Sequence, residues 1–436
     1  MKGKRVLIIT YYWPPSGGSG VQRWLKFVKY LPQTGWTPVV YTPENPELPS
    51  RDESLAKNLP DGLEVVKTKI WEPYTIYKRL VRQDKNQGIN TGFISEDSKP
   101  KFTEKLSRWV RGNFFIPDAR KYWIKPSISH LREYLKENPV DLIISTGPPH
   151  SMHLIALKLK KDLGIPWIAD FRDPWTQIDF YEELLLTKLA DNKHHRLERE
   201  VLQAADHVLV IGHVMKEEME QLAKVRAMTA LPNGFDPDDY PSTDDHTLDE
   251  KFSIAHIGSF APSRNPQTLW KVLAALCEEI VGFRDNLSIK IIGKADHSII
   301  DEIEKKGLIQ HLDRTDYLPH DKVIRAQQSS RVLLLVVNRT ANARMILTGK
   351  IFEYLNSGRP ILAIGPSDGE LAHLLKECSC DSICDYEDYD ATKRQVIKQY
   401  EAYLENLSHN PPSSLNQFSR AQLTGVLAEI MDKVVS

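Results

Sequence analysis

A regular alternation of short apolar runs with amphipathic stretches of helical spacing restricts the fold of this chain more than any other feature. Within the runs, apolar and polar residues do not alternate, which is typical of strands buried on both faces in a parallel sheet covered by helices. The runs that predict strands are RVLIIT (5–10), PVVYT (38–42), LEVVKT (63–68), DLIIS (141–145), WIADF (167–171), HVLVIG (207–212), FSIAHIGS (252–259), LSIKIIG (287–293), RVLLLVV (331–337) and PILAIG (360–365). The sequence therefore predicts an α/β protein.

One segment, 231–250, interrupts this alternation. It is rich in proline, aspartate and turn dipeptides and poor in apolar residues, which is typical of a linker. We therefore predict two Rossmann-like, doubly wound lobes in series, 1–233 and 234–414. Because open α/β sheets bind ligands at the carboxyl ends of their strands, we expect the lobes to face each other across a ligand-binding cleft.

Composition excludes several classes of function. Lys and Arg number 57 against 58 Asp and Glu, so the surface as a whole is not that of a polyanion binder. The apolar runs are much shorter than the roughly 20 residues that span a bilayer. Four cysteines in 436 residues favour a reducing compartment. We expect a cytoplasmic protein that does not bind nucleic acid.

The turn after the first predicted strand contains a glycine cluster that includes Gly17 and Gly18. Glycines at this point let backbone N–H groups approach a phosphate or a sugar. The spacing is not that of a dinucleotide-binding motif, because Arg23 stands where the third glycine would be. The cluster predicts ligand contact, with a turn that needs glycine only for its geometry as the alternative.

Polar side chains follow the fourth and fifth predicted strands. His150 comes after DLIIS, and Asp170, Arg172 and Asp173 come at the end of WIADF. Carboxyl ends of parallel strands meet at one edge of a sheet, so these four residues are candidate catalytic groups. A structural ion-pair cluster is the alternative for Arg172 and its two carboxylates.

The second half repeats the strand-then-glycine turn at HIGSFAPSR. Gly258 and Ser259 lie in this turn, and Arg264 could face an anion. The chain later reads LTGKIFEYL, where Thr348 and Gly349 precede a predicted helix. The N–H groups at a helix start favour a diphosphate.

Two charged residues follow in the same helix. Lys350 adds a positive charge, and Glu353, one turn further on, could accept hydrogen bonds from ribose hydroxyls. The alternative is an ordinary surface helix whose Lys and Glu are solvated.

Taken together, YYWPPSGGSGVQR, NGFD (233–236), HIGS and GKIFEYLNSGRPILAI resemble the motifs of bacterial GT-B fold glycosyltransferases, similar to family 4 ("group 1"). The resemblance covers the whole chain in order. It implies transfer from a nucleotide diphosphate sugar with retention of configuration and without a metal or other cofactor. It also implies an acceptor-binding N-terminal lobe, a donor-binding C-terminal lobe, and a last helix, 415–436, that packs back on the first lobe.

The family motifs can be carried over residue by residue. Gly17 and Gly18 match a glycine turn near the donor phosphates, and Arg264 matches a basic phosphate ligand. Glu353 matches the second Glu of a Glu-x7-Glu motif, but Met345 stands in place of the first. Since that first Glu usually contacts the donor sugar, the identity of the sugar is not predicted.

Segment 101–126 combines seven basic residues with six aromatic and two acidic ones. This mixture suits an anionic membrane surface, with Trp109, Phe114, Phe115 and Trp123 available for insertion. It also suits single-stranded nucleic acid or ordinary packing. The resemblance favours peripheral contact with the inner face of the membrane, where lipid-linked acceptors are found.

We therefore predict a glycosyltransferase that acts on a glycan or lipid-linked acceptor in the synthesis of a cell-surface polysaccharide. Two alternatives remain. A nucleotide-sugar epimerase has the same fold and needs no acceptor. A non-catalytic nucleotide-sugar-binding or membrane scaffold protein would agree with the missing first Glu.

Overall fold

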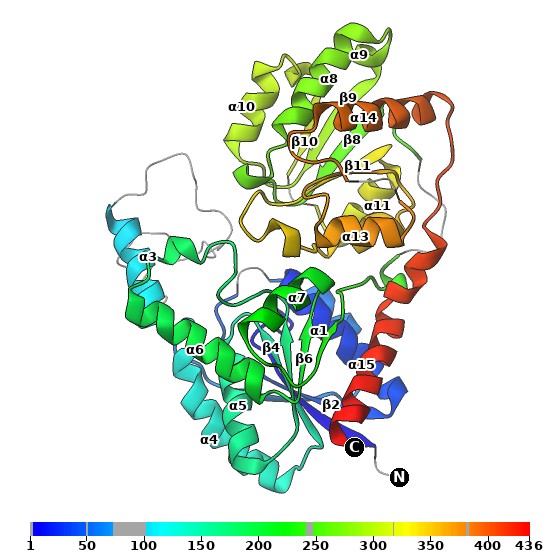
Figure 1. The fold of residues 1–436 in the computed structure, drawn as a ribbon. Helices are drawn as coiled ribbons and strands as arrows, with labels where there is room; N and C mark the ends of the chain where they lie inside the picture. Colours follow the sequence, from blue (N-terminus) through cyan, green and yellow to red (C-terminus); the bar gives the residue numbers. More distant parts are fainter. Residues whose placement is uncertain (1–2, 49–50, 73–101, 241–246, 317, 381–382) are drawn as a thin grey trace. The chain divides into compact units, whose positions relative to one another are not determined.

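A computed structural model of the chain describes residues 3–48, 51–72, 102–240, 247–316, 318–380 and 383–436. The chain divides into two compact units. The first unit comprises Met1–Asn233 and Arg420–Ser436, and the second comprises Gly234–Ser419. Both contain a parallel sheet covered by helices (Figure 1), so the predicted pair of Rossmann-like α/β units is confirmed.

The sheet of the first unit is wholly parallel and has the strand order β3-β2-β1-β4-β5-β6-β7. Its strands are β1 (Lys4–Ile9), β2 (Trp36–Pro43), β3 (Glu64–Thr68), β4 (Leu142–Gly147), β5 (Trp167–Phe171), β6 (His207–Val210) and β7 (Met228–Ala230). Its helices are α1 (Ser19–Tyr30), α3 (Phe102–Phe114), α4 (Lys121–Glu137), α5 (Ser151–Leu163), α6 (Lys188–Ala204), α7 (His213–Leu222) and α15 (Arg420–Val435).

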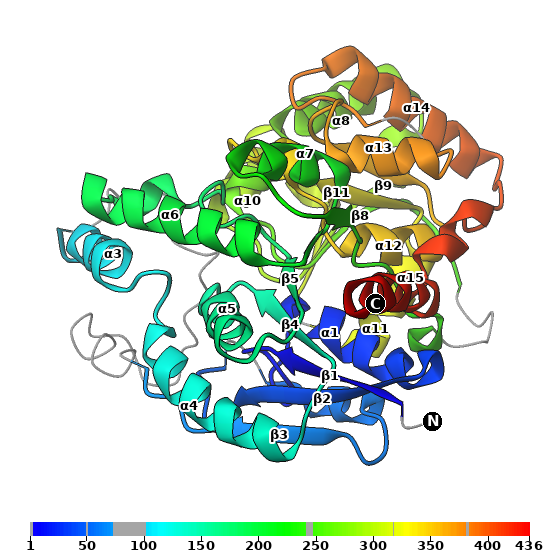
Figure 2. The ribbon, with the colours of Figure 1, turned by 60° about the horizontal axis from the view of Figure 1, so that its bottom comes forward.

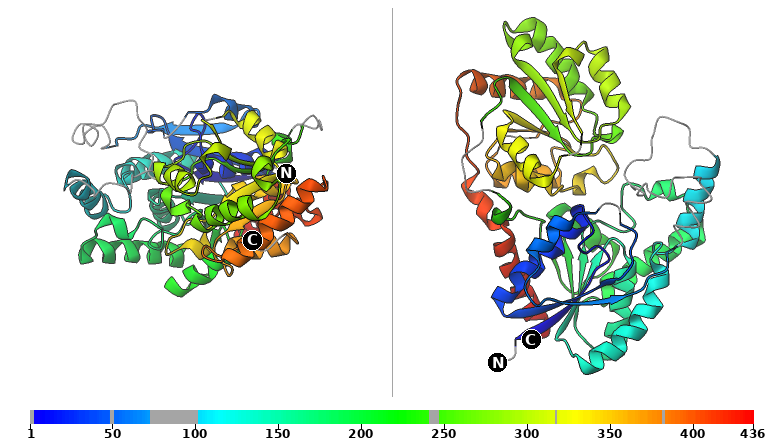
Figure 3. Two further views of the ribbon diagram at one scale, coloured as in Figure 1. Left: turned by 90° about the horizontal axis from the view of Figure 1, so that it is seen from above. Right: turned by 180° about the vertical axis from the view of Figure 1, so that it is seen from behind.

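Helices cover both faces of this sheet. Helices α4 and α5 lie on one face, and α1 lies beside α15 on the other (Figure 2). The C-terminal helix completes the core, because Leu423, Leu427 and Met431 pack with apolar residues of α1 and β1. The chain ends meet at one edge of this unit, where Lys4 Nζ donates to Asp432 at 2.7 Å (Figure 3).

The sheet of the second unit is also parallel, with the order β10-β9-β8-β11-β12. Its strands are β8 (Phe252–Ile257), β9 (Leu287–Ile292), β10 (Leu312–Thr315), β11 (Val332–Val336) and β12 (Ile361–Ile364). Its helices are α8 (Gln267–Glu279), α9 (Phe283–Asn286), α10 (His297–Lys305), α11 (His320–Ser329), α12 (Lys350–Asn356), α13 (Glu370–Glu377) and α14 (Tyr389–Leu404).

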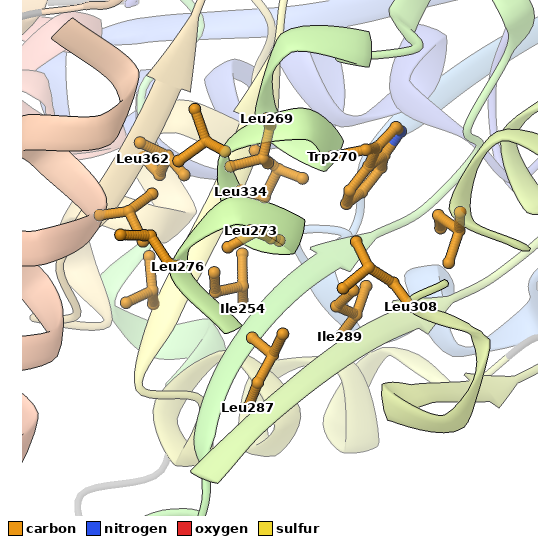
Figure 4. Close-up of a cluster of buried hydrophobic side chains, with 14 of the residues drawn as sticks. Ile254, Leu269, Trp270, Leu273, Leu276, Leu287, Ile289, Leu308, Leu334 and Leu362 are labelled. Carbon is orange, nitrogen blue, oxygen red and sulfur yellow. The ribbon is translucent and has the colours of Figure 1, made fainter. Parts of the chain in front are cut away.

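The core of the second unit forms where α8 and α14 pack on the sheet. Leu269, Leu273 and Leu276 recur at helical spacing along α8 and meet strand residues such as Ile254 and Ile289 (Figure 4). Alternate residues of one strand point to the same face, so these side chains bury a continuous apolar layer. The layer fixes the strand ends that carry the candidate site.

All ten predicted strands are present, and two further strands were not predicted. Strand β7 has only three residues, and β10 reads LDRT, so neither is an apolar run. Both lie at the edge of a sheet, where a strand needs fewer apolar residues. Pro126 lies inside α4.

None of the helices in the described ranges is long and apolar enough to cross a membrane.

We predict that Leu427→Ala destabilises the first unit by about 2–5 kcal/mol, because it removes a fully buried side chain from the core and leaves a cavity. Denaturant unfolding followed by tryptophan fluorescence measures this, since eight of the nine tryptophans belong to the first unit. Val426→Ala is the control, because this neighbouring side chain is 42% exposed. Equal effects of the two substitutions would contradict the packing of α15.

Candidate functional site

The predicted donor residues of the second unit meet at the turn after β8. Gly258 has a φ of 109°, a left-handed conformation that favours glycine, and a Cβ there would overlap the Nζ atom of Lys350. Lys350 is the first residue of α12, so its ammonium group lies against the backbone of the turn. Glycine at 258 is therefore what allows the cation to approach the strand end.

A second cation borders the same turn. Arg264 Nη1 donates to the carbonyl oxygen of Ser259 at 3.1 Å, and its Nε donates to Asn338. Burial and, to a smaller extent, the nearby Arg264 lower the pKa of Lys350 to about 8, and Glu353 opposes this shift. Two cations held beside one backbone turn create a positive potential that suits a phosphorylated ligand.

The start of α12 carries the other predicted donor residues. The hydroxyl of Thr348 accepts a hydrogen bond from the backbone N–H of Lys350 at 3.2 Å, and Gly349 is the N-cap. Glu353 is half-buried, and its Oε2 accepts a hydrogen bond from Gln327 Nε2 of α11 at 3.0 Å. This hydrogen bond fixes the orientation of the Glu353 carboxylate, which can therefore accept hydrogen bonds from a ligand in a defined geometry.

Met345, which replaces the first Glu of the family motif, is buried in the helical turn Ala343–Met345. Its thioether therefore packs in the protein interior. The preceding residue, Arg344, is exposed and forms an ion pair with Asp368 at 3.0 Å.

The first unit contains a pocket of about 310 Å³ at the carboxyl ends of its strands. The aromatic residues that line it are Tyr12, Phe115, Trp175, Phe180 and Tyr181, and the charged ones are Glu47, Arg111, Asp118, Arg120 and Asp173. Aromatic faces together with carboxylates and guanidinium groups suit a ligand that carries hydroxyl groups on an apolar frame. We call this the aromatic pocket.

His150 lies in the wall of the aromatic pocket. Its ring stacks on Trp175, with centroids 4.7 Å apart and planes 5° from parallel. Burial lowers its pKa well below 6.5, and the neighbouring His153 and Arg172 act in the same direction. The imidazole is therefore neutral at pH 7, and its buried Nδ1 has no hydrogen-bond partner in the described structure.

Asp170 does not line this pocket. It is fully buried and forms an ion pair with Arg23 of α1 at 2.9 Å. It also accepts hydrogen bonds from the indole of Trp24 and the hydroxyl of Thr146, both at 2.7 Å. Burial tends to raise its pKa, but these partners lower it overall. Asp170 therefore has a structural role: its hydrogen bonds connect the ends of β4 and β5 to α1.

The other two predicted residues of this group differ in position. Arg172 also lies behind the pocket wall, where it donates to the carbonyl oxygens of Gly20, at 2.9 Å, and Pro148. Asp173 is exposed within the pocket. The surrounding chain still removes part of the water around its carboxyl group, which raises the pKa of this group, while Arg172 lowers it. The structure thus brings His150 and Asp173 to the pocket, and it places Asp170 and Arg172 behind them.

Sequence reasoning missed the residues that hold Trp175 over His150. Glu198 of α6 is buried and accepts hydrogen bonds from the backbone N–H groups of Trp175 and Thr176 and from the Thr176 hydroxyl. The indole of Trp175 donates to His194 Nδ1 at 3.0 Å. Glu198 and His194 are four residues apart in α6, so they lie on the same face of this helix.

The predicted glycine turn belongs to the first unit. Gly18 has a φ of 94° and is the N-cap of α1, and Gly17 is buried beside it. Contact of Gly17 and Gly18 with donor phosphates stays a prediction.

Segment 101–126 forms α3 and the start of α4, with Lys101 outside the described residues. The prediction that Trp123 is available for insertion is wrong. This tryptophan is fully buried, stacks on Tyr41 at 4.8 Å and donates to the hydroxyl of Thr68. Phe114 is 58% exposed and Tyr122 is 43% exposed, so part of the aromatic surface remains.

Among the residues that the structure describes, no three His, Cys, Asp or Glu side chains gather in a group that could hold a metal ion.

Comparison with known protein families gives a partial match. The model of Glycosyltransferase Family 4 matches residues 75–239, which lie mostly in the first unit. No curated protein sequence matches the chain significantly.

Solved structures resemble the chain over nearly its whole length. They include sucrose-phosphate synthase from Thermosynechococcus elongatus, with a TM-score of 0.64, 12% identity and 99% of each chain covered. WaaG, a glycosyltransferase involved in lipopolysaccharide biosynthesis, has a TM-score of 0.58 and 14% identity, covering 98% of this chain and 99% of its own. A putative UDP-N-acetylglucosamine 2-epimerase from Listeria monocytogenes has a TM-score of 0.54 and 8% identity, covering 99% and 96%.

At these identities the structural likeness establishes the fold, and the family match adds the class of enzyme. Together they confirm the resemblance inferred from the sequence motifs: the chain is a glycosyltransferase of the GT-B fold.

Proposed function

We propose that this enzyme transfers a sugar from a nucleotide diphosphate sugar to a glycan or lipid-linked acceptor, with retention of configuration, in the synthesis of a cell-surface polysaccharide. The observation that carries the proposal is the pair of cations, Lys350 and Arg264, beside the glycine turn at Gly258. A nucleotide diphosphate is the anion that this arrangement would hold. The involvement of the similar protein WaaG in lipopolysaccharide biosynthesis supports the class of pathway.

The donor would bind with its diphosphate at the Gly258–Ser259 turn and the start of α12. There Lys350 and Arg264 would neutralise the charge that develops on the leaving diphosphate, which is the main electrostatic task in such a transfer. Glu353, one turn into α12, would accept hydrogen bonds from the ribose hydroxyls. None of these roles needs a metal ion, and we propose that the enzyme uses no cofactor.

The acceptor would occupy the aromatic pocket of the first unit. Aromatic rings such as Trp175 stack on the apolar faces of sugars, and the carboxylates accept hydrogen bonds from their hydroxyls. Asp173 is the group suited to accept a proton from the attacking hydroxyl, since its carboxyl group is exposed in the pocket. The neutral His150, whose ring stacks on Trp175, would form part of the wall that positions the reacting sugar.

An assay of nucleotide diphosphate release, with and without a lipid fraction that contains acceptors, tests the proposal. Acceptor-dependent release is expected. Conversion of the donor sugar to its epimer without an acceptor would replace the proposal by the epimerase alternative. Nucleotide-sugar binding without any turnover would favour the scaffold alternative.

We predict that the affinity for UDP or GDP falls about tenfold between pH 7 and pH 9. The charged form of Lys350 binds the diphosphate, and this form is lost as the pH rises through the pKa of about 8. Calorimetry at several pH values measures the effect, and Lys350→Met should weaken binding at pH 7 and remove most of the pH dependence. Lys251→Met, at an exposed position of the same unit, is the control. A pH-independent affinity in the unmodified enzyme would contradict this donor site.

We also predict that His150→Ala lowers the rate of transfer by about 10–100-fold and leaves nucleotide affinity nearly unchanged, because the residue lines the pocket of the first unit. Steady-state kinetics and calorimetry on the same preparation separate the two effects. His130→Ala removes an exposed histidine of α4 and should change neither. If nucleotide affinity fell together with the rate, the assignment of His150 to the acceptor would be wrong.

Contact with the membrane is the remaining part of the proposal. Exposed apolar side chains of the first unit include Trp71, Leu106, Phe114 and Tyr122. Trp71 and Tyr122 are in ring contact at 4.8 Å, and Lys121 lies over the rings of Phe115 and Tyr122. Aromatic side chains beside lysines suit the headgroup region of an anionic bilayer, and each basic residue there contributes about 1 kcal/mol.

We predict that the protein co-sediments with anionic vesicles at low salt and that binding is largely lost at 1 M salt, where the Debye length is about 3 Å. The double substitution Phe114→Ser with Tyr122→Ser should reduce the bound fraction several-fold, since both side chains are exposed. Val281→Ser is the control, because Val281 is fully exposed but belongs to the second unit. No binding at low salt, or equal effects of these substitutions, would favour a dissolved acceptor.

A further inference from the structure

The second unit contains another pocket, of about 500 Å³, at the amino ends of its strands. Its walls come from Gly358–Ile361 before and within β12, from the end of α13, from α14, and from residues 409–414. The donor residues lie near Gly258, which follows the carboxyl end of β8. The pocket and the donor residues therefore lie at opposite ends of the strands. We call it the amino-edge pocket.

Basic side chains dominate the charge of the amino-edge pocket. Arg359, Lys398 and His409 line it, and none of the described lining residues is acidic. The nearby guanidinium of Arg331 adds to the positive potential, because it acts with burial to lower the pKa of Arg359. A cationic pocket of this kind favours an anionic ligand.

The guanidinium of Arg359 is held in place yet incompletely bonded. Its Nη2 donates to the carbonyl oxygen of His409 at 3.3 Å, and its Nε is buried without a hydrogen-bond partner in the described structure. An orphaned N–H of a charged group is costly, and a phosphate oxygen is the acceptor that a guanidinium prefers. The arrangement therefore calls for an acceptor from outside the chain.

A second unsatisfied group has the opposite polarity. Gln399 of α14 is 4% exposed, its Nε2 donates to the carbonyl oxygen of Ile361 at 3.4 Å, and its Oε1 has no donor among the described residues. Since Oε1 can only accept, a ligand that satisfies it must bring an O–H or N–H group. Hydroxyls of Ser413 and Ser414 line the same pocket.

Residues 409–414, on one side of the pocket, pack closely against the turn before β12. Gly358 has a φ of 66°, and a Cβ there would lie 3.0 Å from Cδ of Pro411, so the two backbones are in close contact. A volume of about 500 Å³ falls in the range of sites for small metabolites.

We propose that the amino-edge pocket binds the phosphate ester of a small polyhydroxy compound, a sugar phosphate, at a site distinct from that of the nucleotide sugar. Arg359 would bind the phosphate, and Gln399 would accept a hydrogen bond from a hydroxyl of the ligand. The site would belong to the same enzyme but take no part in the transfer itself.

Calorimetry on the full chain with glucose 6-phosphate, inorganic phosphate and glucose tests the proposal. Glucose 6-phosphate should bind most tightly, phosphate more weakly and glucose not detectably. Arg359→Ala should weaken glucose 6-phosphate binding about tenfold or more, and Gln399→Leu about threefold, as expected for a charged and a neutral hydrogen bond. Arg284→Ala, which removes an exposed arginine of the same unit, should have no effect.

The affinity for UDP, measured on the same variants, separates this site from the proposed donor site. Saturating UDP should leave glucose 6-phosphate binding in place, and Arg359→Ala should leave UDP affinity unchanged. The proposal is overturned if no sugar phosphate binds, if Arg359→Ala and Gln399→Leu bind as the unmodified protein does, or if UDP competes. Loss of UDP binding in the Lys350 variant has no bearing on these outcomes, so failure of the donor site is recognised separately.

Discussion

The buried ion pair between Arg23 and Asp170 is the interaction on which the ligand-binding edge of the first unit depends. It joins α1 to the end of β5, and Arg23 Nη1 also donates to the carbonyl oxygen of Pro232 at 3.0 Å, where the chain leaves this unit. Removing one partner of such a pair costs about 3–5 kcal/mol, because the other charge is left buried and unpaired. The ion pair thus joins α1, the end of β5 and the exit of the chain.

The fold was largely predictable because burial on both faces leaves a clear pattern in the sequence. Runs such as RVLIIT and DLIIS have uninterrupted apolar centres, so they were recognised as strands without other information. The strands that were missed, β7 and β10, lie at sheet edges where solvent can satisfy part of the backbone. These two strands form because they pair with adjacent strands of the sheet, and the pattern of residues within a short segment does not reveal such pairing.

The site was predictable only as a region. Strand ends identified the edge of the sheet, but they did not distinguish His150 and Asp173, which line the aromatic pocket, from Asp170 and Arg172, which lie behind it. That distinction depends on Arg23, 147 residues before Asp170, turning its guanidinium toward the strand end. Likewise, Glu198 was not singled out from the sequence, because its partner Thr176 is 22 residues away and only the fold brings the two side chains together.

The placement of α15 has a consequence for the order in which the protein can fold during synthesis. The second unit is a continuous stretch, Gly234–Ser419, but the core of the first unit includes Leu423, Leu427 and Met431. A ribosome therefore releases every residue of the second unit before it releases the helix that completes the first. Although most of it is made first, the first unit is completed after the second, and its apolar face beside α1 stays uncovered until α15 has left the ribosome.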